Sequence, residues 1–422
     1  MDIIIREIRQ EDFKTFSNTH MLKNMYQTIE YAELMSRNEY NPLFIGGFKN
    51  GTIVAAAMIL VKGISAFKYG YSPRGFLIDY YDTELLTAFT KKLQAFLSKK
   101  GIIFVKINPE ITYAVVNPEN GSKNVNVNNA KIVDTLQNLG YLKLKDNLYF
   151  ESILPRFTPV INLQSYDIKK IDKNARHRIQ KNTKKGINFI IGDETDFSVF
   201  YEFIKSKRNK PMNYFEDYYN IYKNSNMMDL LLIEIDNNEY LRTIKEEYEK
   251  ESEVNSNTNY EFQKKPNNKA LFNKKMISDK KLNDLNIEIG LITAKLQRNI
   301  LKETIAGALV IKFHNRVYLL INGFDKNFKR LSPNYLMYGK MIEKYKNDGY
   351  KFFDLNGITG DFSDKNPYKG LNDFKLQFKP RVYEYIGEFD LVINKTIYQL
   401  LLSSNKLSKE FQRTDIKPTS ED

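Results

Sequence analysis

A helical pattern in the middle of the chain constrains its fold more than any other feature. Between Tyr240 and Ile300 the sequence becomes rich in charged residues and favours long helices, whereas the flanking segments alternate strand and helix patterns. Asn and Ser residues and Pro266 predict a turn between Asn255 and Asn268. The second helix carries a heptad-like seam, with apolar residues at alternating steps of three and four, at Leu282, Leu285, Ile289, Ile292 and Leu296. We expect an antiparallel helical hairpin inserted into a domain; the alternative is a pair of surface helices packed on the body.

The segments on either side of this stretch predict mixed α/β structure. In them, runs of β-forming residues alternate with runs that have apolar residues at helical spacing. Before the stretch, we expect strands at 2–8, 42–48, 52–62 and 102–107, and helices at 83–99 and 131–139. After it, we expect strands at 306–313, 316–322 and 352–355, and a helix at 333–348. The second series loosely repeats the order of the first, which favours a duplicated α/β unit.

These patterns also divide the chain into domains. A chain of 422 residues is too long for one ordinary hydrophobic core, so two domains are expected. We place a first domain at 1–150 and a second domain at 151–237 and 303–422, with the hairpin at 238–302 between its two parts. The predicted fold class is α/β (α+β).

Charge and composition restrict the chemistry. The net charge of +13 favours an anionic partner such as nucleic acid, anionic lipid or a phosphorylated small molecule. The sequence has no cysteine, and His20, His177 and His314 each stand alone, so thiol chemistry is excluded and a histidine metal site is not expected. It also has no Gly-rich phosphate loop and no serine-nucleophile turn. The longest apolar run, 53–61, is too short to span a bilayer, and the N-terminus lacks a signal-peptide core, so we expect a cytoplasmic protein.

A cluster of basic residues follows the first domain. Eight Lys and Arg residues lie between Lys169 and Lys185, with only Asp167 and Asp172 close to them in the sequence. On a helix, these residues would form a broad positive face that can contact phosphates. The alternative is a solvated helix face.

The segment from Tyr71 to Tyr80 places an Arg, an Asp and aromatic residues around a Gly turn. Arg74 can bind a phosphate or carboxylate through two hydrogen bonds, and Asp79 can hold an amine. The segment therefore either lines a pocket or forms a structural turn with an internal pair between Arg74 and Asp79.

A late segment combines a strand end with a glycine loop. Asp354 precedes Gly357 and Gly360, and the chain then continues to Phe374 and Lys375. Strand ends followed by glycine loops often hold ligands in α/β folds. Lys375 is therefore either a residue that neutralises a developing oxyanion or an ordinary surface lysine.

Taken together, these segments resemble the FemABX peptidyltransferases of Gram-positive bacteria over nearly the whole chain. No single motif decides this, but the order and the gaps agree. The series consists of Gln27-Thr28 with Glu33-Leu34, Arg74-Gly75 with 78–80, 182–185, 218–220, Lys265-Pro266 with 273–275, 357–360, Phe374-Lys375, 385–389 and 393–395.

The resemblance implies two GNAT-like acyltransferase domains with a coiled-coil arm in the second. It implies transfer of glycine, serine or another small amino acid from aminoacyl-tRNA to the interpeptide bridge of a lipid-linked peptidoglycan precursor, at the inner face of the membrane. Aminoacyl-tRNA is then a co-substrate, no other cofactor is expected, and a homo- or hetero-dimer with a related enzyme is allowed.

The resemblance also assigns roles to residues. Lys375 beside Phe374 would stabilise charge at the reacting ester. The substrate-binding residues would be Tyr71, Arg74, Asp79, Tyr80, Gly357 and Thr359. Contacts to tRNA would come from Lys181, Lys184 and Lys185.

Two places depart from the family pattern. Met35 stands where members often carry a Lys that contacts the precursor's diphosphate, and 213–216 lack the Arg-Asp pair common before Tyr218-Tyr219. These departures leave precursor binding open. The competing hypotheses are a CoA-dependent GNAT N-acyltransferase and a non-catalytic adaptor that binds tRNA or a partner.

Overall fold

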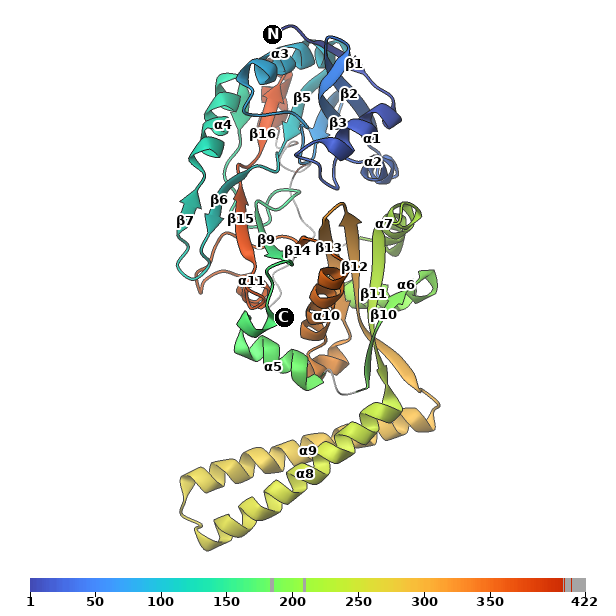
Figure 1. Ribbon diagram of the computed structural model, residues 1–422, viewed down its shortest axis with the longest axis vertical. Coiled ribbons are helices and arrows are strands. Elements are labelled where there is room, and N and C mark those ends of the chain that lie inside the picture. Colours follow the sequence, from blue (N-terminus) through green and yellow to red (C-terminus); the bar gives the residue numbers. More distant parts are fainter. Residues whose placement is uncertain (183–185, 208–209, 405, 407–410, 412–422) are drawn as a thin grey trace.

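The computed structural model describes residues 1–182, 186–207, 210–404, 406 and 411. In this part of the chain two β-sheets lie one above the other along the long axis, and a helical hairpin projects from the lower end (Figure 1). The expected mixed α/β class is confirmed.

The first sheet forms the upper half. Its hydrogen-bonded order is β1 (Ile4–Glu7), β2 (Asn41–Lys49), β3 (Thr52–Ile64), β4 (Phe67–Ser72), β5 (Ile102–Ile107), β16 (Phe389–Val392) and β8 (Tyr141–Lys143). Successive strand residues point to opposite faces, so Ala55, Ala57 and Ile59 of β3 join one core while Ala56, Met58 and Leu60 join the other. The helices of this half are α1 (Gln10–Thr19), α2 (Ile29–Ser36), α3 (Thr83–Lys99) and α4 (Val127–Asn138).

Helix α3 shows why the sequence predicts its helix so well. Its buried residues Leu85, Leu86, Phe89, Leu93 and Leu97 recur at helical spacing and pack into the core on one face of the first sheet. The side chain of Asp82 accepts a hydrogen bond from the Leu85 amide and caps the first turn. After the helix, Gly101 has a φ of +72°, which glycine adopts without strain. The observed limits equal the expected 83–99.

The second sheet forms the lower half. Its order is β10 (Ile187–Gly192), β11 (Met228–Asp236), β12 (Lys302–Phe313), β13 (Arg316–Phe324), β14 (Phe352–Asp354), β9 (Phe157–Asn162), β15 (Arg381–Tyr385), β6 (Thr112–Val116) and β7 (Lys123–Val125). The helices that follow or flank these strands are α5 (Lys173–Asn182), α6 (Phe197–Ile204), α7 (Met212–Asn224), α10 (Pro333–Asn347) and α11 (Lys369–Leu376). Helix α12 (Lys395–Ser403) follows β16 and packs against β5 of the first sheet. Short 3-10 helices occupy Ile168–Lys170, Glu194–Asp196 and Lys326–Leu331.

The two sheets share one connection pattern. Strands β1 to β4 run antiparallel to their neighbours and β4 then pairs parallel with β5. Strands β10 to β13 do the same before β13 pairs parallel with β14. The duplicated α/β unit that the sequence favours is therefore present in the strand order.

The sheets do not follow the expected boundary near residue 150. Strands β6 and β7 precede that boundary but belong to the second sheet, and β16, near the C-terminus, belongs to the first. The physical reason is that the β5–β6 and β15–β16 segments each cross from one sheet to the other. The pairing partners show the exchange, because Val116 lies opposite Val382 and Ile107 opposite Phe389. These exchanged strands connect the two halves of the chain.

The hairpin consists of α8 (Asn237–Lys264) and α9 (Lys269–Gln297), inserted between the neighbouring strands β11 and β12. Figure 1 shows that it extends away from the sheets, as the insertion hypothesis predicts. The expected turn was too long, because helix α8 continues to Lys264. Within α8, the side-chain amide of Asn255 donates a hydrogen bond to Asp279 of α9, with 2.7 Å between Nδ2 and Oδ1. These polar residues therefore connect the two helices.

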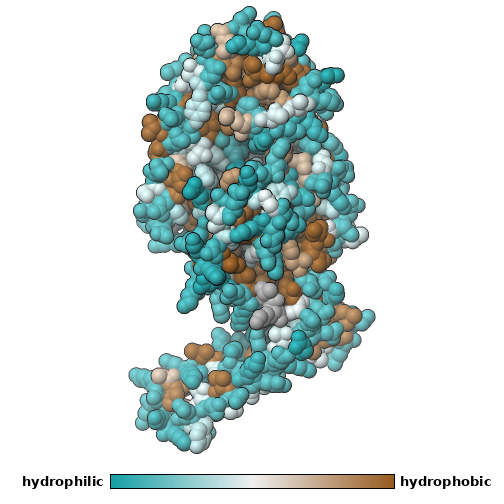
Figure 2. Space-filling model, in the orientation of Figure 1, coloured by the Kyte–Doolittle hydropathy of each residue, from teal (hydrophilic) through white to brown (hydrophobic). Residues whose placement is uncertain are grey.

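The apolar seam of α9 is buried where the hairpin meets the second sheet. Leu285 and Ile292 are 1% and 3% exposed, and they share a core with Tyr240, Ile244 and the sheet. Beyond this base, Figure 2 shows apolar patches along the hairpin surface. Exposed apolar residues there include Tyr260, Phe272, Met276 and Ile277. Within the described residues, none of the helices, including these two long ones, is apolar enough over a sufficient length to cross a membrane.

Candidate active site

A cavity of about 130 Å³ lies where β14 ends beside β13. The two strands are parallel and their pairing stops at Tyr318 and Asp354, so the chain segments after this point separate and leave a crevice. The walls come from β13, from the loop after β14, from helices α10 and α11, from Phe150, and from Ser206 and Lys207 after α6. Residues in these walls include Leu319, Asn322, Asn334, Tyr338, Leu355, Gly357, Phe374 and Lys375.

Lys375 is buried in the wall of this cavity. Only 6% of the residue is exposed, and its Nζ donates a hydrogen bond to the carbonyl oxygen of Gly357 at 2.9 Å. A buried ammonium requires such an acceptor, because water no longer solvates it. The alternative of an ordinary surface lysine is therefore wrong. At this position the ammonium can act on an oxygen bound in the cavity.

Phe374 and Gly357 fix the surroundings of Lys375. The ring of Phe374 meets Tyr335 and Tyr338 of α10 edge to face, with centroid distances of 5.0 and 4.9 Å, which holds α11 against α10. A Cβ atom at Gly357 would overlap the ring of Pro155, so the loop can pass this point only as glycine.

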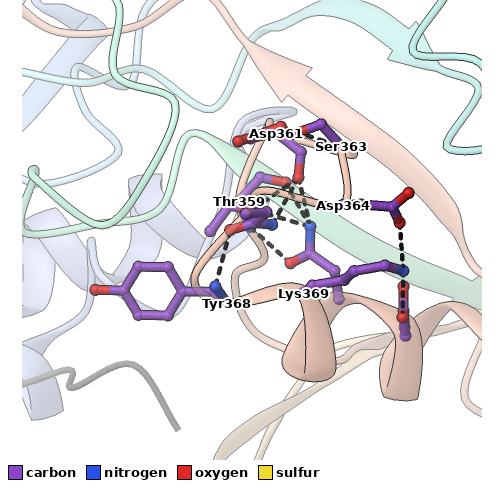
Figure 3. Close-up of polar contacts among 9 residues, drawn as sticks. Thr359, Asp361, Ser363, Asp364, Tyr368 and Lys369 are labelled. Carbon is purple, nitrogen blue, oxygen red and sulfur yellow. Dashed lines mark hydrogen bonds and ion pairs between the residues drawn. The ribbon is translucent and has the colours of Figure 1, made fainter. Parts of the chain in front are cut away.

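Thr359 organises the loop behind Gly357. It is fully buried, its hydroxyl accepts hydrogen bonds from the side-chain amides of Asn366 and Asn372, and it donates to the carbonyl of Asp361. Figure 3 shows Thr359 and Asp361 at the centre of this network, with the Asp364–Lys369 pair at its edge. Thr359 lies outside the residues that line the cavity. Its position indicates a loop-shaping role instead of the expected substrate contact.

A second, smaller cavity adjoins the first. The two share Leu319, Leu320 and Asn356 in their walls. The second cavity lies between the halves of the molecule, because Arg74 and Glu110 come from the first half of the chain and Tyr318 and Asp354 from the second.

Charged side chains surround this second cavity. Arg74 donates to the carbonyl of Pro155 at 2.7 Å, and its guanidinium lies 4.4 Å from the ring centre of Tyr385. Arg316 forms an ion pair with Glu110. Burial raises the pKa of Asp354 to about 6, although the positive charge of Arg316 opposes this shift.

Comparison with known proteins assigns the chain. The model of the FemAB family matches residues 8–406. The chain belongs to the FemAB family. The aminoacyltransferase FemA of Staphylococcus aureus strain MW2 is 27% identical over 412 residues, which cover 94% of this chain and 97% of FemA. FemA of strain N315 gives the same identity and coverage. The predicted family and enzyme class are confirmed, and the chain is an aminoacyltransferase.

A solved structure shows the same fold. The crystal structure of FemX superposes with a TM-score of 0.73 at 20% sequence identity, covering 95% of this chain and 100% of FemX. The overall fold of this chain is therefore one already seen in the crystal structure of FemX.

Of the four residues predicted between Tyr71 and Tyr80, only Arg74 lines a described cavity. Tyr71 is buried and accepts a hydrogen bond from the Asn108 amide, and Tyr80 accepts one from the backbone amide of Phe76. Both tyrosines therefore hold the fold together. Asp79 is exposed and accepts from the Tyr81 amide. Its partner differs from those of Arg74, so the internal pair considered from the sequence does not form.

The basic cluster is only partly described. Lys184 and Lys185 lie outside the described residues. Lys181 is exposed on α5 and lines a cleft at the base of the hairpin, where Lys280 and Lys281 of α9 and Arg330 also lie. The structure thus brings positive groups from three separate segments to the hairpin base.

The two segments that depart from the family pattern lie on helices α2 and α7, which pack against each other. Met35 is half-buried among apolar side chains between α2 and α7, and Tyr218 and Tyr219 of α7 lie in the same core. The nearby Arg37 forms an ion pair with Asp217 of α7 at 2.5 Å. This region therefore joins the two halves of the enzyme by packing and by one cross-domain ion pair.

Sequence reasoning did not assign the charged group around the second cavity. Asp354 marks a predicted strand end, but Glu110, Arg316 and Tyr385 stand in no motif with it. Only the pairing of distant strands brings them together. The one local sign of this site in the sequence was the carboxylate of Asp354 near the end of an apolar strand.

Proposed function

We propose that this FemAB enzyme transfers a small amino acid, such as glycine or serine, from aminoacyl-tRNA to an amine of a lipid-linked peptidoglycan precursor. The observation that carries the proposal is the buried Lys375 ammonium beside Gly357, at the wall of a strand-end cavity. Similarity to FemA, which is named an aminoacyltransferase, supports the donor chemistry. Addition to the interpeptide bridge follows from the same resemblance.

The reaction needs charge stabilisation more than it needs a protein nucleophile. The acceptor amine attacks the ester carbonyl of the charged tRNA, a C–N bond forms, and the bond from the carbonyl carbon to the ribose oxygen breaks. Negative charge develops on the carbonyl oxygen in between. Lys375 is suited to stabilise this oxygen, since a fixed positive charge acts more strongly in a site from which water is excluded.

The size and charge of the sites support small aminoacyl groups and an RNA donor. A cavity of about 130 Å³ favours a short side chain on the transferred amino acid. Lys181 and Lys280 at the hairpin base can contact phosphates, in a cleft whose wall also carries Glu247, Asp284 and Glu288. We propose that this cleft contacts the tRNA, and that the enzyme works at the inner face of the membrane, where the lipid-linked precursor is exposed to the cytoplasm.

A donor-exchange experiment tests the proposal. The enzyme is incubated with lipid II and a mixed pool of charged tRNAs, and the product is weighed by mass spectrometry. We expect a mass increase of one or more small aminoacyl residues, which ribonuclease treatment of the donor abolishes. Transfer from acetyl-CoA as the sole donor would instead identify a CoA-dependent N-acyltransferase. No transfer from either donor, with retained binding of charged tRNA, would identify an adaptor.

A further inference from the structure

The second cavity holds a carboxylate that forms no ion pair with a described residue. Asp354 is 8% exposed, and its Oδ1 accepts a hydrogen bond from the backbone amide of Asn356 at 2.9 Å. Glu110, by contrast, is paired with Arg316, and Arg74 is held by the Pro155 carbonyl. In the described part of the chain, no hydrogen bond is formed to the other carboxylate oxygen of Asp354.

An independent feature of the same wall is the hydroxyl of Thr158. Thr158 is 2% exposed and lines the second cavity, and its Oγ1 has no hydrogen-bond partner among the described residues. A buried polar atom without a partner costs free energy and calls for an explanation. The cavity measures about 30 Å³, which is room for one small polar group.

The second carboxylate oxygen of Asp354 and the Thr158 hydroxyl can both accept hydrogen bonds. An ammonium group has only hydrogen-bond donors, so it fits between these two acceptors. We propose that the second cavity receives the attacking amine of the acceptor, and that Asp354 takes a proton from it while the Thr158 hydroxyl accepts a further hydrogen bond. This inference rests on the proposed transfer reaction and adds a catalytic base to it.

The positions of the two cavities support this assignment. Asn356 lies in the wall of both, its backbone amide holds Asp354, and the next residue, Gly357, holds Lys375. An amine beside Asp354 and an ester carbonyl beside Lys375 would therefore meet across two consecutive residues of one loop. Holding both reactants in this way is itself a large part of the catalysis of a two-substrate reaction.

The charge environment suits a base that works near neutral pH. The pKa of Asp354 is raised to about 6, first by burial and then by the negative charge of Glu110, while Arg316 and Arg74 lower it. Other titratable groups on the cavity wall are Tyr26, Tyr318 and Tyr385. A base is most effective when its pKa lies close to the working pH, where it is ionised and still binds a proton well.

The protons balance as follows. The acceptor enters as an ammonium and loses its first proton to the Asp354 carboxylate, which later releases it to water. The neutral amine then attacks the ester carbon. The nitrogen of the resulting intermediate loses a second proton, which goes to the ribose oxygen as the bond from carbon to that oxygen breaks. The products are an amide, a tRNA with a free ribose hydroxyl and one proton in solution.

Two acceptor substrates distinguish a role of Asp354 as a base from a structural role. Transfer from charged tRNA is measured with lipid II, whose amine is protonated at pH 7, and with hydroxylamine, which is neutral at pH 7 and needs no base. The uncatalysed reaction with hydroxylamine is subtracted. For Asp354→Asn we expect a loss of about 10²-fold with lipid II, disappearance of the pH dependence near pH 6, and hydroxylamine transfer within about threefold of wild type.

A second variant addresses the hydroxyl. Thr158→Val keeps the shape of the side chain and removes a group that has no described partner, so we expect unchanged folding and a KM for lipid II about tenfold higher. Equal losses with both acceptors in Asp354→Asn, or a wild-type rate with lipid II, would overturn the inference while wild-type transfer still supports the proposed function. A wild-type enzyme that transfers to neither acceptor would refute the proposed function itself.

Discussion

Replacing Lys375 by Met gives the most informative single substitution in the proposed active site. The substitution keeps most of the apolar stem and removes the ammonium that donates to the Gly357 carbonyl at 2.9 Å. Loss of one preorganised oxyanion partner typically slows turnover by about 10²–10³, which corresponds to about 2.7–4 kcal/mol in activation free energy. The free energy of unfolding should change much less, by ~1 kcal/mol, because the lost hydrogen bond and the removed buried charge offset each other.

The matched control is Lys369→Met in the same helix. The Lys369 side chain is 40% exposed and pairs with Asp373 at the edge of the loop network, away from the cavity wall. Single-turnover transfer is measured with saturating lipid II and charged tRNA, and folding is followed by urea denaturation. We expect the control to turn over within about threefold of wild type. If Lys375→Met does so as well, Lys375 does not stabilise the reacting oxygen, and backbone amides near Gly357 would have to do it.

Two further predictions concern stability. Leu285→Ala should lower the free energy of unfolding of the main transition by about 2–5 kcal/mol, because Leu285 is 1% exposed in the core shared with the second sheet. The control, Leu291→Ala, changes a residue that is 61% exposed on the same helix and should alter this free energy by less than about 0.5 kcal/mol. Equal urea midpoints for the two variants would contradict the packing described. Asp354→Asn should stabilise the protein by about 3 kcal/mol at pH 7. The pKa of Asp354 is about 6 in the folded protein and 3.8 for an ordinary aspartate, so the wild type loses stability as the pH rises from about 4 to 6. The gain should vanish below about pH 4, and a gain that stays constant between pH 4 and pH 7 in urea titrations would refute the assigned pKa.

Local sequence patterns predicted the elements whose burial is regular. The expected helix at 83–99 and strand at 102–107 match the structure residue for residue, because each has a continuous buried face and a clear beginning and end. The hairpin was also predictable, although its turn was placed too early. Asn255 belongs to helix α8 because its partner, Asp279, lies on the other helix, and no local pattern contains that information.

Pairing between distant strands was not predictable from the sequence. Strand β16 joins the first sheet through register with β5, about 280 residues earlier in the chain, and nothing in either segment specifies the other. The same non-local pairing places Glu110 beside Arg316 and brings Arg74 to the cavity of Asp354. Lys375 was found from the resemblance to a family, but its burial and its contact with Gly357 required the fold.

The central claim is that the ester carbonyl of a charged tRNA lies against Lys375 in the cavity beside Gly357. A crystal structure with a hydrolysis-resistant analogue tests it most directly, namely the aminoacyl-adenosine end of tRNA with an amide in place of the ester. We predict that the carbonyl oxygen of the analogue lies about 3 Å from Nζ of Lys375, with the amino acid side chain inside the 130 Å³ cavity. An analogue bound with its carbonyl away from Lys375, or bound outside this cavity, would contradict the account.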